Sequence, residues 1–330
     1  MSLLMRLGAC ALALLACPAF AQSDARRPQY VIISFDGALH IEQWERSRAL
    51  AERTGARFTY FLSCVYLLSP ETLKAYRGPG MAAGRTNVGR GFSIDDVRLR
   101  LEQIWQARSE GHEIASHACG HFDGGTWSAA DWKHELEQFR TILRDAWSVN
   151  RIDGEPADWR SFAENEVVGF RAPYLSTGKG LFTALAAEGF RYDASTVSNG
   201  PAEAADKDGV TRFSLPMIPE GPRGRRVIAM DYNLYARHSG AKENAAKAAA
   251  FAARAYEAFH AAFAREYAGD RIPLQLGFHF TLMNGGAYWE ALERFAKEVC
   301  VKPEVRCVGY RQYLEETAPV SAALRPSIGG

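Results

Sequence analysis

The chain has 330 residues and is almost neutral, with 39 Lys and Arg against 38 Asp and Glu. A balanced charge gives no reason to expect a nucleic acid or an anionic membrane surface as a partner. The length is sufficient for one large domain with an ample core, and nothing after the N-terminal segment approaches a membrane span. The sequence leaves the oligomeric state open.

The N-terminal residues 1–21 have the pattern of a secretory signal peptide. Arg6 supplies a positive start, residues 7–16 form an apolar run too short to cross a bilayer, and a small-x-small motif ends at Ala21. We expect cleavage after Ala21, which leaves residues 22–330 as a single domain in the periplasm or outside the cell. In an alternative interpretation, Cys17 is a lipid-attachment site, although the residues before it fit that pattern poorly.

An even number of cysteines remains after this segment: Cys64, Cys119, Cys300 and Cys307. In an exported protein this favours disulfides. Cys300 and Cys307 enclose a short loop that contains a proline, so we expect these two to pair.

Strand and helix patterns alternate along the chain. Apolar, β-branched runs predict strands over residues 30–35, 58–62, 114–115, 167–170, 190–195, 227–231, 273–280 and 305–308. Helical periodicity predicts helices over residues 41–54, 93–110, 127–143, 181–188, 241–268 and 289–299. Residues 149–165 and 198–225 are predicted to be irregular. The alternation, without repeat or linker, favours one parallel α/β barrel over two domains.

Residues 76–92 form a Gly-rich, Arg-bearing loop. Its glycines do not fit the phosphate-binding pattern GxxxxGK[ST], and no apolar strand directly precedes it. We interpret it as a loop at the rim of the barrel and not as a nucleotide site.

Polar residues fall at the carboxyl ends of the predicted strands, namely Asp36, His117, Arg171, Asp193 and His279. In α/β barrels this rim is where catalytic groups assemble. The positions therefore predict a site.

His117 and His121 are four residues apart, a spacing at which two imidazoles can converge on one divalent ion. A metal held there would activate water, and Asp36 could take the proton from that water. The alternative is that these are two unrelated surface or packing histidines. The GxSxG motif that usually surrounds a serine nucleophile does not occur in the sequence.

The other strand-end residues suggest an acid and supporting charges. His279 could protonate a leaving group, and Arg171 could pair with Asp193 while holding Asp36 ionised. A structural ion pair and a core histidine are the alternatives that the residues leave open.

These motifs, in this order, resemble the polysaccharide deacetylase family of carbohydrate esterases, the NodB-homology group, and its chitin-deacetylase-like branch in particular. The similarity covers about residues 30–315. The motifs are Ser34-Phe-Asp36, His117-Ala-Cys-Gly-His121, Arg171-Ala-Pro-Tyr174, Tyr192-Asp193 and Leu276-Gly-Phe-His279.

The resemblance implies a distorted (β/α)7 barrel and metal-dependent removal of acetyl groups from N-acetylated polysaccharides, with zinc as the expected ion. The implied roles are base for Asp36, acid for His279, metal ligands for His117 and His121, oxyanion donor for the Tyr174 N–H, and tuning of base and acid for Arg171 and Asp193.

The chain departs from the family at Gly37, where the third metal ligand is normally an aspartate. Two imidazoles make a weak site, since catalytic zinc usually has three protein ligands. Asp36 could itself ligate the ion, or Cys119 or Asp123 could substitute. Alternatively the site is degenerate and the protein binds glycans without cleaving them. In such a barrel Cys64 and Cys119 could instead meet as a disulfide, the option we favour, which would remove Cys119 as a ligand.

The polymer is not identified by the sequence. Trp127, Tyr232 and Trp289 could stack on sugars at the rim or could equally be packing residues. A cytosolic amidohydrolase of the same fold is disfavoured by the export signal.

Overall fold

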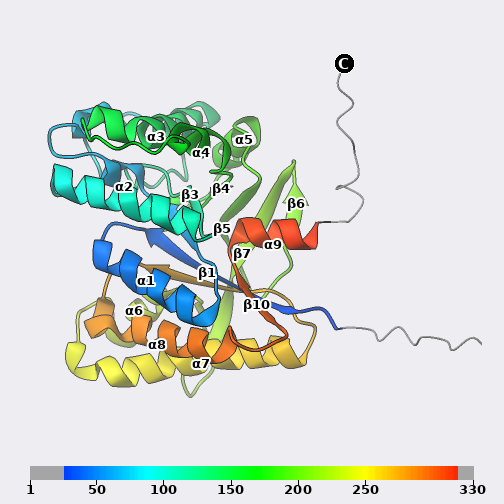
Figure 1. Cartoon of the computed structure of the whole chain (residues 1–330). Coiled ribbons are helices and arrows are strands. Elements are labelled where there is room, and N and C mark those ends of the chain that lie inside the picture. The colour runs from blue at the N-terminus through cyan, green and yellow to red at the C-terminus, as the bar shows by residue number, and fades with distance from the viewer. Residues whose placement is uncertain (1–25, 319–330) are drawn as a thin grey trace, which may run out of the picture.

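Parallel strands form the centre of the molecule and helices cover them on the outside (Figure 1). The computed structural model describes residues 26–318, so the predicted signal peptide and the alternative acylation site at Cys17 lie outside the described residues. The main sheet contains β1 (Gln29–Gly37), β2 (Thr59–Leu62), β3 (Glu113–Ser116), β4 (Gly169–Phe170), β5 (Tyr192–Ser198), β6 (Ala205–Lys207), β7 (Val210–Glu220), β9 (Leu274–His279) and β10 (Val305–Val308).

The sheet follows the order β10-β1-β2-β3-β4-β5-β7-β6, and β9 pairs in parallel with β1. Only β6 and the short β8 (Arg225–Ile228) run antiparallel, both against β7. This is the expected α/β fold with a mainly parallel sheet.

The residues after β8 link β7 to β9 and so complete a distorted ring of strands. The Ala229 N–H donates to the Pro216 carbonyl, and the Gly277 N–H donates to the Ala229 carbonyl, both at 2.9 Å. A Cβ at position 277 would lie 2.7 Å from Met230 Cε, so a larger residue there would require the Met230 side chain to shift. The ring is thus joined at this point by a single parallel bridge between Met230 and Gly277.

Helices connect the strands and pack around them. They are α1 (Ile41–Thr54), α2 (Ile94–Ser109), α3 (Ala129–Val149), α4 (Trp159–Asn165), α5 (Lys179–Ala187), α6 (Asp231–Ser239), α7 (Ala248–Ala268), α8 (Met283–Val299) and α9 (Tyr310–Thr317). Predicted ends are confirmed where the local chemistry is strong. Ser93 accepts a hydrogen bond from the Asp96 N–H at the start of α2, and Gly55 ends α1 at φ 70°.

Two segments that the sequence predicted to be irregular are ordered elements. The region 149–165 contains α4, whose Trp159 and Phe162 are buried, and the region 198–225 contains the long strand β7. Pro216 and Pro219 interrupt the strand pattern in β7, but they are accommodated in the ladders with β5 and β8.

The region between β8 and β9 also differs from the prediction. Residues 227–231 were expected to form one strand, but β8 ends at Ile228 and α6 begins at Asp231. The expected helix over 241–268 begins only at Ala248, because Gly240 ends α6 in the left-handed conformation and a short turn intervenes.

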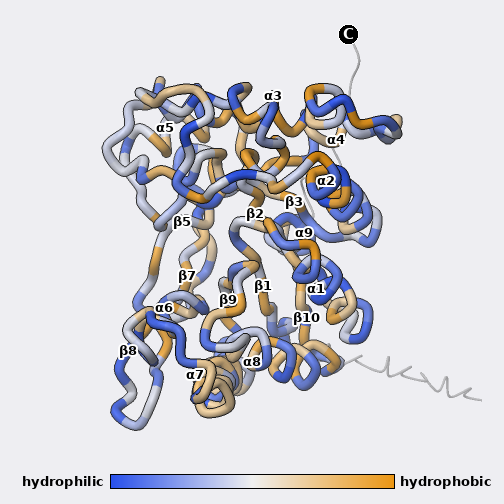
Figure 2. Tube along the Cα trace, turned by 90° about the vertical axis from the view of Figure 1, so that its left-hand side faces the viewer, coloured by the Kyte–Doolittle hydropathy of each residue, from blue (hydrophilic) through white to orange (hydrophobic). Residues whose placement is uncertain are grey.

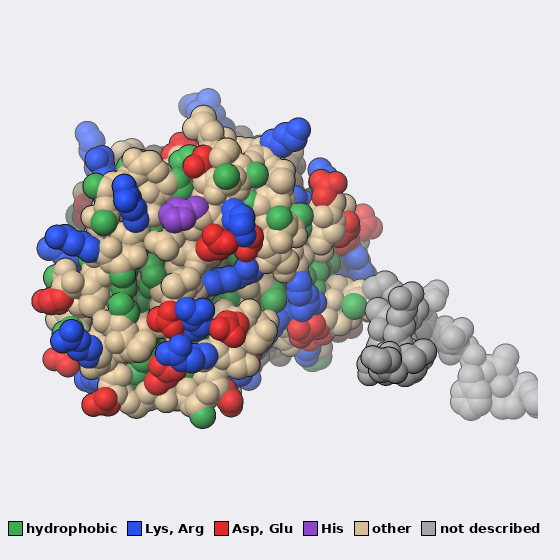
Figure 3. Space-filling view, turned by 90° about the horizontal axis from the view of Figure 1, so that it is seen from above, with side chains coloured by type: hydrophobic (Ala, Val, Ile, Leu, Met, Phe, Trp, Pro, Cys, Tyr) green, Lys and Arg blue, Asp and Glu red, His purple; other side chains and the backbone are tan. Residues whose placement is uncertain are grey.

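The hydropathy of the chain follows this arrangement. Apolar residues are concentrated on the strands and the inner helix faces, and polar residues lie on the outer faces (Figure 2). On the face seen in Figure 3, acidic and basic side chains are interspersed. This face therefore carries charges of both signs and not a patch of one sign.

Two disulfides are present, Cys64–Cys119 and Cys300–Cys307, as expected. They fit an oxidising compartment such as the periplasm or the extracellular space. Within residues 26–318, no helix combines the length and apolar character needed to cross a bilayer.

Candidate active site

The carboxyl ends of the strands border a pocket of about 680 Å³. The sheet register explains why distant residues meet there. Asp36 at the end of β1 lies opposite His279 at the end of β9, and Ser116 of β3 lies opposite Phe170 of β4. His117 and Arg171 are the next residues along those two strands, so the predicted strand-end positions are brought together at one edge.

Arg171 connects several residues at the base of the site through hydrogen bonds. Its side chain is fully buried, and its Nη1 donates to Asp36 Oδ1 at 2.8 Å and to Ser34 Oγ at 2.9 Å. Its Nη2 donates to the Tyr310 hydroxyl at 2.8 Å, and its guanidinium lies 4.3 Å from the centre of the Phe61 ring. Arg171 is therefore paired with Asp36 and not with Asp193.

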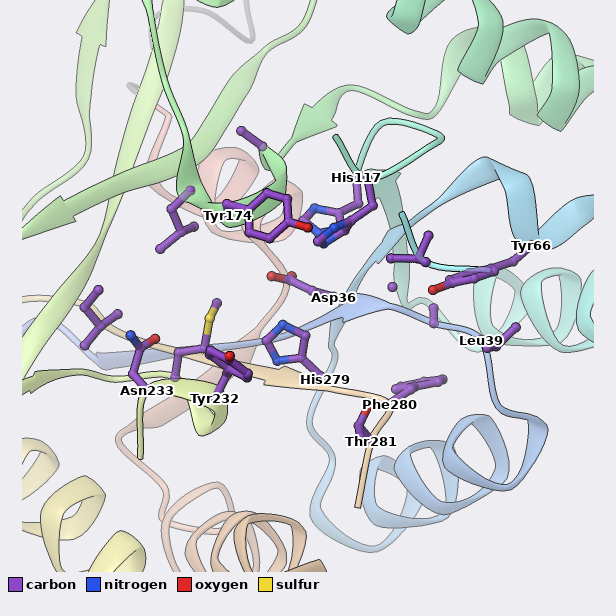
Figure 4. Close-up of a pocket in the computed structure, with 18 of the residues that line it drawn as sticks. Asp36, Leu39, Tyr66, His117, Tyr174, Tyr232, Asn233, His279, Phe280 and Thr281 are labelled. Atoms are coloured by element: carbon purple, nitrogen blue, oxygen red, sulfur yellow. The ribbon is translucent and has the colours of Figure 1, made fainter. Parts of the chain in front are cut away.

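Asp36 is held in the ionised form. Burial alone would raise its pKa, but the Arg171 guanidinium, together with the His117 and His279 rings, lowers it below the ordinary value. In Figure 4 the Asp36 carboxylate lies between the His117 and His279 side chains. An ionised carboxylate in this position can accept a proton from a molecule in the pocket.

His279 has a carboxylate partner that sequence reasoning missed. Its Nδ1–H donates to Asp231 Oδ1 at 2.6 Å, and its backbone N–H donates to Asp231 Oδ2 at 2.7 Å. Burial by itself would lower the His279 pKa, but the Asp231 carboxylate raises it to about 9. The imidazole is thus protonated at neutral pH and can donate a proton from Nε2.

Asp231 could have been found from one signal. It directly follows an apolar, β-branched run, as Asp36 does, and so it was a further candidate for a strand-end acid. Its contact with His279 depends on the bridge between Met230 and Gly277, and no local pattern predicts that pairing.

His117 and His121 both reach the pocket as neutral imidazoles. The His117 Nδ1–H donates to the Arg171 carbonyl at 2.8 Å, which leaves Nε2 available as a ligand. His121 Nδ1 is buried without a hydrogen-bond partner, and burial lowers the His121 pKa to about 3. The rings lie 5.1 Å apart, centre to centre. An orphaned nitrogen beside an oriented imidazole fits a divalent ion held by two histidines.

A third ligand is not supplied by the positions that we considered as substitutes. Cys119 is in a disulfide, and Asp123 accepts hydrogen bonds from Ser176 Oγ at 2.5 Å and from the Gly125 N–H at 3.0 Å. Within residues 26–318, no group of three His, Cys, Asp or Glu side chains is arranged to hold a metal ion. Gly37 itself has φ 88°, a conformation that other residues rarely adopt.

Tyr174 lies at the mouth of the pocket on the turn that follows Arg171. Its backbone is in the left-handed region at φ 59°, and its side chain is 60% exposed. The ring packs edge-on against the His121 ring, with 4.7 Å between the ring centres. Strained backbone of this kind is often found where main-chain groups serve a site.

Asp193 does not reach the pocket. It is fully buried, its Oδ1 accepts a hydrogen bond from Ser195 Oγ at 2.5 Å, and its Oδ2 lies 3.6 Å from Arg212. The expectation that Asp193 pairs with Arg171 is therefore wrong. Ser195 Oγ also accepts from the Ala172 N–H at 2.8 Å, so Ser195 links Asp193 to the turn after Arg171.

The three candidate stacking aromatics have different surroundings. Tyr232 lines the pocket and is 51% exposed. Trp289 is buried and its Nε1 donates to the His279 carbonyl at 2.9 Å, and Trp127 packs against Trp132. Only Tyr232 is placed to meet a molecule in the pocket.

Comparison with known proteins gives one partial sequence match and several structural ones. No family model matches the chain. "Chitin deacetylase 1" of Bombyx mori is 28% identical over 109 residues, which are 32% of this chain and 18% of that relative. The matched stretch thus spans less than a fifth of the relative's length.

Two solved structures share the fold. A Mycobacterium smegmatis protein assigned as a polysaccharide deacetylase has a TM-score of 0.55 at 19% identity, over 92% of this chain and 94% of that one. A Pseudomonas aeruginosa protein with the same assignment has a TM-score of 0.52 at 15% identity, over 88% and 92%. The chain thus shares its fold with these two proteins and is similar over a limited stretch to a chitin deacetylase.

Proposed function

We propose that this protein is an exported, metal-dependent N-deacetylase that hydrolyses the acetamide groups of N-acetylated glycans. One observation carries the proposal. The pocket holds an ionised carboxylate, Asp36, and a protonated imidazole, His279, and each is fixed in that state by its own buried partner. A base and an acid whose environments separate their pKa values are what hydrolysis of an amide requires.

His117 and His121 would hold the metal, for which zinc is the expected ion. When bound, the ion would act as a Lewis acid that polarises the acetyl carbonyl and makes a water molecule a better nucleophile. Asp36 Oδ1 accepts a hydrogen bond from Arg171, and within the described residues no hydrogen bond to Oδ2 is found. Water or this oxygen would complete a coordination shell that two imidazoles leave open.

The protein groups then move protons in a defined order. Asp36 takes a proton from the water that attacks the acetyl carbon, and the Tyr174 N–H donates to the oxyanion that forms. Breaking of the C–N bond follows, and the His279 Nε2–H gives its proton to the departing amine. The products are acetate and a free amino sugar.

The pocket wall favours an uncharged glycan. Besides Asp36 and the histidines, no charged side chain lines the pocket within the described residues, and much of the wall is apolar, including Leu39, Val88 and Met230. Buried apolar walls disfavour a carboxylate without a partner. A chitin-like oligomer therefore fits better than a glycan that carries acidic groups, and the partial match to a chitin deacetylase supports the same class.

A second candidate is a glycan-binding barrel without catalysis. The observation in its favour is the lack of a three-ligand group within residues 26–318, together with Gly37 in place of the family's aspartate. In that case the pocket would bind a glycan but would not hydrolyse it.

The two candidates are separated by measuring acetate release from chitin oligomers and from peptidoglycan, with zinc or cobalt added. We expect release by the wild-type protein and its loss in Asp36→Asn, with glycan binding retained. If no substrate releases acetate with either metal while chitin oligomers bind, the protein is a binder.

We further propose that the mature protein is a single domain, residues 22–330, in the periplasm or outside the cell. Support comes from the signal-like N-terminal sequence and the two disulfides. The mass of the mature protein would test cleavage after Ala21 against acylation at Cys17.

A further inference from the structure

Glu135 is a buried carboxylate that the proposed chemistry does not use. It projects from α3 and is fully excluded from solvent. Its Oε1 accepts hydrogen bonds from the Cys119 N–H at 2.9 Å and from the Gly120 N–H at 3.2 Å. The Tyr76 hydroxyl donates to its Oε2 at 2.9 Å. The hydrogen bonds of this buried carboxyl group therefore come mainly from the segment between the two candidate metal ligands.

The segment from His117 to His121 needs such support because its backbone is strained. Ala118 and His121 have φ values of 57° and 54°, which non-glycine residues adopt only when their surroundings impose them. The Cys64–Cys119 disulfide fixes the segment from one side. Glu135 fixes it through hydrogen bonds to two main-chain N–H groups, the second of which belongs to the residue directly before His121.

The same carboxylate also anchors the Gly-rich loop 76–92. Tyr76 at the start of that loop is buried, and its hydroxyl packs so closely on Gly120 that a Cβ there would lie 2.4 Å away. Further along, the Asn87 N–H donates to the Gly120 carbonyl at 2.8 Å, and the next residue, Val88, lines the pocket. The contacts among Glu135, Tyr76 and Gly120 thus connect α3, the candidate metal-binding segment and the pocket wall.

We propose that Glu135 is a positioning residue that sets the orientation of His121, and with it the affinity of the metal site and the seating of loop 76–92. This proposal rests on the proposed metal-dependent function. A carboxylate presents two acceptor oxygens to three donors, whereas a glutamine presents one acceptor and a competing NH₂ group. Replacing the carboxyl group by an amide should therefore loosen the segment that carries His121.

Glu113 provides a matched control. It is also a buried carboxylate of the barrel, and it accepts hydrogen bonds from one backbone N–H, that of Arg311, from the Tyr192 hydroxyl and from Thr59 Oγ1. These partners lie outside the segment 117–121 and outside the pocket wall. Glu113→Gln should cost stability in a similar way without acting on the metal site.

The test compares wild type, Glu135→Gln and Glu113→Gln as purified, disulfide-intact proteins titrated with Co²⁺ alone, followed by calorimetry and by the visible spectrum of the bound ion. We expect Glu135→Gln to bind Co²⁺ about 10-fold more weakly with an altered spectrum, since supporting residues of metal sites typically contribute at least that much. Glu113→Gln should match wild type. Equal affinity in all three proteins, or equal weakening in both variants, would overturn the proposal.

Amide hydrogen exchange of residues 117–121 gives a readout that needs no metal. Faster exchange in Glu135→Gln than in Glu113→Gln supports the positioning role, and equal exchange contradicts it. If wild type binds no Co²⁺, the proposed metal centre fails and this exchange measurement alone decides the role of Glu135. If Glu135→Gln does not fold, Tyr76→Phe removes only one donor, and the same faster exchange is expected, to a smaller extent.

Discussion

At the scale of single residues, the Arg171 guanidinium is the group on which the charge state of the pocket depends. It satisfies Asp36, Ser34 and Tyr310 from a position without solvent contact. Removing one partner of a buried pair leaves the other charge uncompensated, which is far more costly than breaking a pair at the surface.

We predict that Arg171→Met lowers the free energy of unfolding by about 3–5 kcal/mol at neutral pH, because Asp36 is left buried and unpaired. Urea unfolding measures the change. The control is Arg160→Met, whose partners Asp145 and Glu155 lie near the surface, with an expected loss of about 1 kcal/mol or less. Similar losses in the two variants would argue against the role given to Arg171.

His279 provides a pH dependence whose sign follows from its partner. Asp231 raises the pKa of His279 to about 9, so the proton that the acid donates is present below that pH and is lost as the pH rises through it. The wild-type kcat/KM should therefore fall on the alkaline side near pH 9.

We predict that Asp231→Asn moves this alkaline limb to lower pH. Without the carboxylate, burial is the dominant influence, and the His279 pKa returns toward or below its ordinary value of about 6.5. The profile of kcat/KM against pH, measured on a chitin oligomer, shows the shift. Asp193→Asn is the control, because Asp193 has no contact with His279 and should leave the limb in place. An unmoved limb in Asp231→Asn would exclude the assignment.

At the scale of elements, the sequence predicted most of the strands that carry the site residues. The reason is that the end of a strand is indicated by a short local sequence pattern. Asp36, His117 and Arg171 follow short apolar runs. The strands β3 and β4 end directly before His117 and Arg171, and β1 ends one residue after Asp36. Parallel pairing then brings the residues together without further information.

Tertiary pairing was not predictable in the same way. The strand β7 was missed because its prolines weaken the local pattern, and its place is fixed by β5 and β8. Asp231 was missed for a related reason, since its contact with His279 exists only after β7 and β9 are bridged. Asp193 was expected to pair with Arg171 because both follow predicted strands, but its carboxylate is buried beside Ser195, which donates to it.

The two disulfides lead to a prediction about separate parts of the fold. Cys64–Cys119 closes a separation of 55 residues and Cys300–Cys307 one of 7. Loop-closure entropy predicts a loss of about 4 kcal/mol for Cys64→Ser with Cys119→Ser, and about 2 kcal/mol for Cys300→Ser with Cys307→Ser. Chemical unfolding of the two double variants measures both losses.

Only the first of these pairs should also affect the metal site, since Cys119 lies between His117 and His121. Co²⁺ affinity is therefore expected to weaken in the Cys64/Cys119 double variant and to remain at the wild-type level in the other. Equal Co²⁺ affinity in the two double variants would show that the Cys64–Cys119 disulfide does not affect the metal site.

At the scale of the whole molecule, the ring of strands places the base and the acid side by side and gives each a separate buried partner. Arg171 reaches Asp36 from the turn after β4, and Asp231 reaches His279 from the start of α6. Opposite protonation states can therefore coexist in one pocket of about 680 Å³ with largely uncharged walls. The proposed hydrolysis requires this combination of a base and an acid.

Whether the pocket catalyses hydrolysis is tested most directly by comparing His279→Ala with wild type, both loaded with zinc, for turnover and for binding of the same chitin oligomer. Loss of the acid removes an interaction made in the transition state, so kcat should fall by about 100-fold or more while the dissociation constant of the oligomer changes little. Turnover and binding reduced by the same factor, or acetate release unaffected by the substitution, would contradict the proposed role of His279.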